Sequence, residues 1–372
     1  MKIEKSALAA ALRRTSHIRP ERVNVFAGGD DSVIVNAQEK GHGGLVSQET
    51  INAAEVDGIR FQAPYAHFRS MIDAMPDGPL TITVTGEDEI TVKNGRTRLK
   101  SRVVSDPAID ALSSDGANTV ITLAGQPLRK AIAQTSHAMG QKDVRPYLNA
   151  LHLRISQGKA EAVATDGYQM MVSRFAVEHD GAVVDLSIIN TAVPMLAAMA
   201  DENDVSIHMH EKTTVFKSGN WMCRLPVMAP FNGWLRVLGS IQEKGVEAVV
   251  DVPPLLASMN RMLVTHEGGD LGNKKPCLVR ILGTNNVLTL SLVGNDSEDA
   301  VDTEGMSGIV DFWINARQVA DALEATKVAK VRLHYSNPAG QQNGQGKLVL
   351  LPESTSDMTQ AAFLSMTMEH RI

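Results

Sequence analysis

A histidine pair and an isolated aspartate are the residues of this sequence whose types and spacing could do chemistry. His208 and His210 alternate along a segment with strand character, so their side chains share a face at a spacing that could bind a metal ion. No third ligand is evident near them, and a polar sheet face is the simpler interpretation. Asp166 could act as a general base, but an aspartate directly before Gly167 more commonly forms a turn.

Two glycine-rich stretches also fail to match known catalytic patterns. PAGQQNGQGKL resembles a phosphate-binding loop, but its spacing is wrong and Leu348 stands where Ser or Thr would bind Mg²⁺, so we interpret it as a hairpin turn. GHGG at Gly41 is similar to an esterase oxyanion loop, yet there is no GxSxG, no HExxH and no GxGxxG after a strand. The sequence therefore predicts no enzyme, no metal site and no cofactor.

Composition restricts the class of protein further. The 372 residues are 43% hydrophobic and 21% charged, as in soluble globular proteins, and no apolar run approaches a membrane span, so we expect a cytoplasmic protein. Cys223 and Cys277 form no CxxC pattern and are expected to be small buried side chains. A net charge of -6 argues against a surface that coats nucleic acid, but it permits a basic lining inside an acidic shell.

A helical pattern recurs three times along the chain. Apolar residues at helical spacing end in Thr followed shortly by His in SALAAALRRTSHI from Ser6, QPLRKAIAQTSHAM from Gln126 and PPLLASMNRMLVTHE from Pro253. A second set of amphipathic helices reads FRSMIDAMPDG, VPMLAAMADEND and ARQVADALEATK. The two sets together predict six short helices in three equivalent pairs.

The interval between these copies predicts three homologous domains. Met75, Met199 and Leu323 occupy equivalent positions and recur every 124 residues. After each comes alternating strand sequence and then a turn in which glycine can supply a positive φ, at Asn94-Gly95, Ser218-Gly219 and Asn343-Gly344. Landmarks that share one period indicate repeats, although coincidental spacing in one large mixed domain is the alternative.

The predicted fold class is α+β, with two helices packed on antiparallel β-sheets in each of three repeated domains. Turn and polar residues collect around residues 110–118 and 238–245. We therefore expect domains at residues 1–117, 118–241 and 242–372.

The middle of the chain resembles a known family. DVRPYLNALHLRI (143–155) and AVATDGYQMMVSR (162–174) are similar to the two most recognisable stretches of the bacterial beta clamp, the beta subunit of DNA polymerase III. Residues 68–101 resemble the second half of that family's first domain and the last 60 residues resemble its third, whereas residues 23–55 match poorly. The resemblance implies a DNA sliding clamp, a processivity factor built from DNA-clamp domains. Its head-to-tail homodimer would form a ring around double-stranded DNA, bind it without sequence preference, and tether the DNA polymerase and the clamp loader.

The resemblance also implies a pocket that receives short apolar-aromatic peptides from partner proteins. The matching positions are Leu148, Thr165, Gly167, Tyr168, Gln169, Met170, Pro230, Arg236, Val237, Leu364, Ser365, Met366 and Met368. Flexible methionines suit such a pocket because they repack around different ligands, although a plain core role in the last strand is the alternative. The chain departs from the family at Tyr168-Gln169-Met170, at its MTMEHRI end and at PFNGWLRV, which is one residue longer, so we expect an altered peptide preference.

Basic residues recur at equivalent places in and just beyond the first helix of each repeat. A clamp needs such residues to attract phosphates without reading bases, and a solvated helix face is the alternative for each one. The candidate DNA-facing residues are Arg13, Arg14, Arg19, Arg22, Arg129, Lys130, Lys142, Arg145, Arg261, Lys274 and Lys275. Leu263 and Val264 match apolar dimer-interface positions of the family, but they could equally complete a helix core.

Two other functions stay open at this point. The poor match of residues 23–55 is the support for a clamp-like partner-binding protein that does not encircle DNA. An α+β hydrolase has only Asp166 and the histidines in its favour, and it would need a cleft that holds an acid or base with a perturbed pKa.

Overall fold

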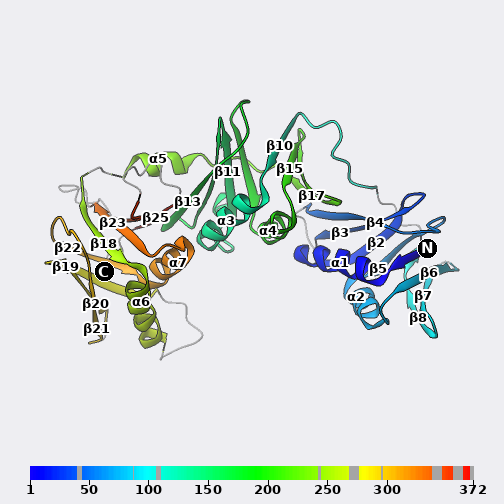
Figure 1. The fold of residues 1–372 in the computed structure, drawn as a ribbon, viewed down its shortest axis with the longest axis horizontal. Helices are drawn as coiled ribbons and strands as arrows, with labels where there is room; N and C mark the ends of the chain where they lie inside the picture. The colour runs from blue at the N-terminus through cyan, green and yellow to red at the C-terminus, as the bar shows by residue number, and fades with distance from the viewer. Residues whose placement is uncertain are drawn as a thin grey trace. The chain divides into compact units, whose positions relative to one another are not determined.

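The computed structural model describes residues 1–39, 44–86, 88–105, 110–241, 244–267, 276–294, 296–336, 346–354 and 363–368. These residues form helices and β-sheets in which every described strand pair is antiparallel, so the predicted α+β class is confirmed (Figure 1). The chain divides into two compact units: residues 1–129 with 191–228, and residues 130–190 with 229–372. The domain boundaries expected from the sequence stay predictions.

A nine-stranded sheet runs through the first unit. Its strand order is β10-β15-β16-β17-β4-β3-β2-β5-β9. The bounds are β2 Pro20–Gly29, β3 Ser32–Glu39, β4 Val46–Asn52, β5 Arg60–Pro64, β9 Val104–Ser105, β10 Thr119–Leu123, β15 Val205–Met209, β16 Thr213–Ser218 and β17 Trp221–Pro226. Because β17 pairs with β4, this sheet joins residues 191–228 to residues 1–129.

Helices and a smaller sheet complete the first unit. The four-stranded sheet has the order β1-β6-β7-β8, with bounds β1 Lys2–Glu4, β6 Pro79–Thr85, β7 Glu89–Asn94 and β8 Thr97–Arg102. The helices are α1 Lys5–Thr15, followed by the 3-10 turn η1 Ser16–Ile18, α2 Tyr65–Ala74 and α4 Val193–Glu202. Leu8 and Leu12 of α1 are fully buried with Phe61 and Phe68. Tyr65 donates a hydrogen bond from its hydroxyl to the Leu12 carbonyl at 2.6 Å, which ties α2 to α1.

The second unit also contains two sheets. The eight-stranded sheet has the order β14-β11-β12-β13-β25-β24-β23-β18, and the four-stranded sheet has the order β21-β20-β19-β22. Bounds are β11 Ala150–Ser156, β12 Lys159–Thr165, β13 Gln169–Ala176, β14 Val184–Ile189, β18 Val246–Asp251, β19 Leu278–Thr284, β20 Val287–Leu292, β21 Glu298–Asp302, β22 Val310–Asn315, β23 Lys330–Ser336, β24 Lys347–Pro352 and β25 Phe363–Met368. Strand β25 inserts between β13 and β24, so the end of the chain completes the larger sheet.

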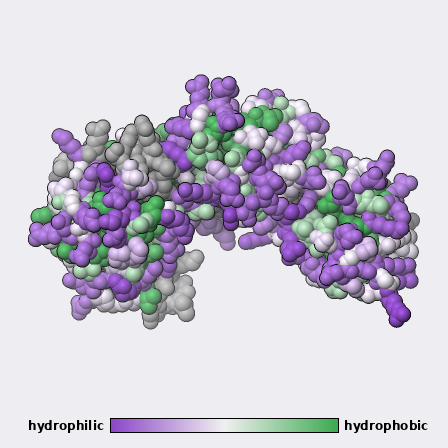
Figure 2. Space-filling model, viewed as in Figure 1, coloured by the Kyte–Doolittle hydropathy of each residue, from purple (hydrophilic) through white to green (hydrophobic). Residues whose placement is uncertain are grey.

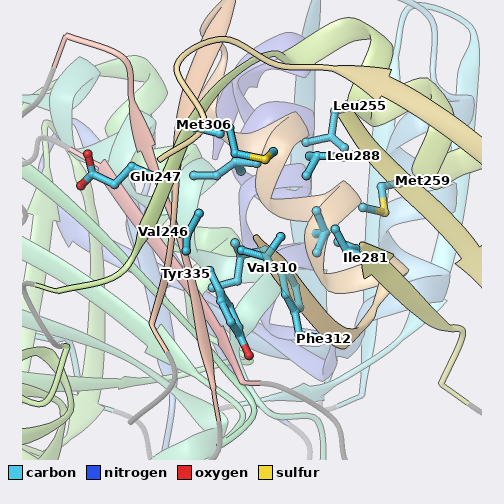
Figure 3. A pocket seen from close by; sticks show the side chains of 14 residues that line it. Val246, Glu247, Leu255, Met259, Ile281, Leu288, Met306, Val310, Phe312 and Tyr335 are labelled. Carbon is cyan, nitrogen blue, oxygen red and sulfur yellow. The ribbon is translucent and has the colours of Figure 1, made fainter. Parts of the chain in front are cut away.

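Helices α6 Val252–Glu267 and α7 Ala316–Thr326 lie side by side in the second unit (Figure 1). Beside them is a cavity of about 20 Å³, lined mainly by apolar side chains such as Leu255, Met259, Val310 and Phe312 (Figure 3). The remaining elements are α5 Gly233–Gly239, the 3-10 turns η2 Ser136–Ala138 and η3 Pro146–Asn149, and α3 Gly125–Thr135, where the chain passes from one unit to the other.

The six helices expected from the repeat are all present. They are α1, α3 and α6 in the first set and α2, α4 and α7 in the second. The glycine turns are confirmed where the structure describes them, because Gly95 has a φ of 54° between β7 and β8 and Gly219 has a φ of 57° between β16 and β17. The third turn, at Asn343-Gly344, lies outside the described residues.

Candidate peptide pocket and nucleic-acid interface

A tight turn after β12 carries several of the candidate pocket residues. The Thr165 hydroxyl donates to the Gln169 carbonyl at 2.6 Å and accepts from the Gly167 amide at 3.0 Å. The Asp166 carboxylate accepts from the backbone amides of Tyr168 and Gln169 at 2.8 and 2.9 Å. Asp166 therefore forms the turn, as expected.

Gly167 brings the turn close to Leu148. Its φ of 93° is a conformation that favours glycine, and a Cβ at this position would lie 3.8 Å from Leu148 Cδ1. Leu148 is buried in η3, whereas Tyr168 is 56% exposed. The turn thus presents an exposed aromatic side chain next to a buried leucine.

Strand β25 lies beside this turn through its pairing with β13. In the register, Met170 faces Met366 and Val172 faces Leu364, and Ser365 and Met368 belong to the same strand. The backbone of β25 is therefore next to that of β13, and the assignment of these residues to a peptide pocket stays a prediction. The side chains of Leu364, Ser365, Met366 and Met368 lie outside the described part of the structure.

Helix α5 packs beside this region, and it was not predicted from the sequence. Trp234, the second residue of α5, is only 1% exposed and belongs to a cluster with Met170, Val172 and Val349. Val237, a candidate pocket residue, packs against the same cluster, whereas Arg236 is exposed. The apolar spacing of Trp234, Val237 and Leu238 was the one local signal for a helix here.

One residue of the PFNGWLRV stretch, Phe231, forms an aromatic stack. Phe231 lies next to the exposed Pro230 and stacks on Tyr147, with ring centroids 4.6 Å apart. His152 supports this stack at 5.2 Å from Phe231 and is bonded to the Tyr147 carbonyl and the Ser187 hydroxyl, both at 2.9 Å. Burial lowers the pKa of His152 to about 4, so the ring is neutral at neutral pH. Sequence reasoning missed this cluster, because Phe231 is far in the sequence from Tyr147 and His152.

The candidate DNA-facing residues differ in how they are paired. Arg13, Arg19, Lys130 and Lys142 are exposed, and the exposed Arg22 donates to Gln62 at 2.8 Å. Carboxylates pair with four others: Arg14 with Glu49 and Glu202, Arg129 with Asp201, Arg145 with Asp143, and Arg261 with Asp299. The Arg145 pair is tight enough to lower the pKa of Asp143 to about 2. Lys274 and Lys275 lie outside the described residues.

The two candidate dimer-interface residues have different environments. Leu263 is 4% exposed within the core around α6, whereas Val264 is 73% exposed. Exposed apolar side chains of this kind are scattered, and the face in Figure 2 is mostly hydrophilic with small hydrophobic patches. Only Val264 of the pair is therefore accessible to a partner.

Strands at the sheet edges carry opposite charges. At the edge of its four-stranded sheet, β8 exposes Arg98 and Arg102, and at the edge of the other four-stranded sheet β21 exposes Glu298 and Asp302. No ion pair within the described residues involves these four side chains. The charge pattern of the edges was present in the sequence, but their positions as edges were not.

Metal-binding and membrane-spanning features have no support in the described part of the chain. No group of three or more His, Cys, Asp or Glu residues there could hold a metal ion, and His208 bonds Ser206 at 3.0 Å. No helix among these residues is long and apolar enough to cross a membrane.

Comparison with known proteins finds similarity to DNA polymerase III beta subunits. Residues 122–227 match the family model for the central domain of the DNA polymerase III beta subunit. The beta sliding clamps of Pseudomonas aeruginosa and Vibrio cholerae are 24% and 21% identical over 302 and 299 residues, with 79% of each chain covered in both cases.

Solved structures extend the likeness of fold over the whole chain. The Pseudomonas aeruginosa DNA polymerase III subunit beta gives a TM-score of 0.85 at 18% identity and covers 100% of both chains. A putative beta subunit from Eubacterium rectale gives 0.86 at 14% identity, covering 100% of this chain and 99% of that one.

Proposed function

Because this chain is a divergent member of the bacterial DNA polymerase III beta subunit family, the beta sliding clamps, we propose that it is itself a DNA sliding clamp. Two copies join head to tail in a ring that encircles duplex DNA in the cytoplasm and tethers a DNA polymerase and a clamp loader through short peptides. The observation that carries this proposal is the likeness of fold over the full chain to beta subunits. Such a protein acts by topology and tethering, and it needs no catalytic group of its own.

Charge complementarity between the edge strands β8 and β21 supports a closed ring. Unpaired strand edges are templates for pairing with another chain, and contacts between unlike surfaces close into a ring when the rotation fits. If β8 of one copy pairs with β21 of the other, the cations of Arg98 and Arg102 meet the anions of Glu298 and Asp302. A ring of two copies contains this joint twice.

The joint can be tested by reversing charge on one edge. Arg98→Glu with Arg102→Glu places like charges across the joint, so we expect a monomer where the wild type is a dimer in sedimentation velocity. Adding Glu298→Arg and Asp302→Arg restores opposite charges and should restore the dimer. A dimer that survives the first pair of changes would reject this joint.

Retention on DNA tests the function itself. After loading, the wild-type ring should stay on circular plasmid and slide off the ends of the same plasmid once it is linearised. The charge-reversed monomer is the control, and it should be lost equally from both forms. Equal loss of the wild type from both would instead support a clamp-like partner-binding protein that does not encircle DNA.

The turn at residues 165–169, η3 and the Met170–Trp234 cluster support the tethering role. Together they place a buried leucine, exposed aromatic side chains and an adaptable methionine next to the last strand. Such a surface suits a short peptide with apolar and aromatic side chains, because a few well-placed anchors dominate peptide affinity. A polymerase tail peptide that binds the wild type should compete with a clamp-loader peptide for this region.

A further inference from the structure

Two consecutive arginines of α1 have opposite environments. Arg14 is held on three nitrogens: Nη1 lies 2.5 Å from Glu49 Oε1, and Nε and Nη2 each donate to one oxygen of Glu202 at 2.8 Å. Arg13 is exposed and has no ion pair within the described residues. The sequence alone treats the two as equivalent.

The partners of Arg14 come from two segments that are far apart in the sequence. Glu49 belongs to β4 and Glu202 to the end of α4, so Arg14 joins residues 1–129 to residues 191–228 within the first unit. The guanidinium also lies over the Trp221 ring at 5.9 Å, and Trp221 pairs with Glu49 in the β17–β4 register. Arg14 therefore lies beside the β17–β4 pairing, through which these two segments form one sheet.

Because its partner Glu49 is buried, Arg14 cannot exchange this ion pair for another anion without a large cost in stability. The Glu49 side chain is only 8% exposed, and its Oε2 has no hydrogen-bond partner among the described residues. A buried carboxylate that loses its cation is strongly destabilising. The Arg129–Asp201 ion pair differs from the Arg14–Glu49 pair, because both of its side chains are 51% exposed. Such surface pairs contribute little to stability, so Arg129 can exchange Asp201 for a phosphate.

We propose that Arg14 is a positioning residue that fastens residues 191–228 to residues 1–129, and that Arg13 is the phosphate contact on α1. The Arg13 half of this proposal rests on the proposed function, whereas the Arg14 half does not. The adjacent residues form a matched pair, since Arg13→Gln and Arg14→Gln remove the same charge from the same helix.

The experiment measures both variants by thermal unfolding and by anisotropy titration of a short duplex at several salt concentrations. For Arg13→Gln we expect an unchanged Tm and a slope of log K against log [NaCl] that is smaller by about 0.9 per subunit. For Arg14→Gln we expect the wild-type slope and a Tm lower by on the order of 5–10 °C. Equal loss of slope in both variants, or an unchanged Tm in Arg14→Gln, would overturn the proposal.

Two further variants separate fastening from general loss of charge. Arg14→Lys keeps the charge but loses the fork that holds Glu202 in two places, so its Tm should also fall. Changing Glu49 and Glu202 to Gln together with Arg14→Gln leaves no uncompensated buried charge and should recover much of the lost Tm. If the wild type binds no DNA, the Arg13 assignment and the proposed function both fail, while these Tm measurements still decide the role of Arg14.

Discussion

Trp234→Ala should release α5 from the sheet of the second unit and weaken peptide binding. Trp234 is the buried anchor of α5, in contact with the cluster that contains Met170, Val172 and Val349. The helix has only seven residues, and an isolated helix of this length is unstable in water. Its position therefore depends on packing, above all on this one side chain.

The magnitude follows from the burial of the indole. A tryptophan buries about 150–250 Å² of surface, which at about 25 cal/mol per Å² corresponds to about 4–6 kcal/mol. Measured Trp→Ala changes in protein cores cost about 3–5 kcal/mol. Only the partly buried Val237 and Leu238 of α5 then remain in contact with the cluster, so we expect the undocked helix to be populated.

The assay is titration of a fluorescent polymerase tail peptide, with hydrogen exchange to follow the amides of α5. Apparent affinity falls in proportion to the fraction of molecules in the competent state, so we expect binding at least tenfold weaker and faster exchange at residues 233–239. Leu235→Ala is the control, because Leu235 is on the same helix but 40% exposed. Equal affinity of the two variants would refute the reasoning that α5 shapes the pocket.

Three further predictions concern stability in the second unit. Burial lowers the pKa of His152 to about 4 in the folded state, so the unfolded state takes up the proton first as the pH falls. The free energy of unfolding should therefore be at its full value above about pH 6.5 and should fall toward pH 4 by on the order of 3 kcal/mol. In urea unfolding, His152→Gln should lack this pH-dependent loss. Val310→Ile adds a methyl group beside the 20 Å³ cavity and should raise the free energy of unfolding by up to about 1 kcal/mol in urea unfolding. Val279 is buried but does not line that cavity, so Val279→Ile should lower the free energy of unfolding by overpacking. Gly167→Ala places a side chain at a φ of 93° and should cost about 1–2 kcal/mol in the same assay, and an unchanged midpoint would argue against strain at this turn.

The sequence by itself determined the features that depend on local pattern. The amphipathic spacing in α1, α3 and α6 and the 124-residue interval between equivalent positions predicted the paired helices that the structure contains. Gly95 and Gly219 were identifiable as turn residues because a positive φ is a property of single residues. The turn at Asp166 was predictable for the same reason, since its hydrogen bonds reach only two and three residues along the chain.

Only the tertiary structure decided which side chains meet over long separations. The stack of Phe231 on Tyr147 joins residues far apart in the sequence, and α5 is stable through Trp234 because the sheet below it supplies a partner surface. Arg13 and Arg14 look alike in the sequence, but only one of them faces carboxylates from β4 and α4. A charge acquires its role from the partner and the burial that folding gives it, and neither of these is encoded in the neighbouring residues.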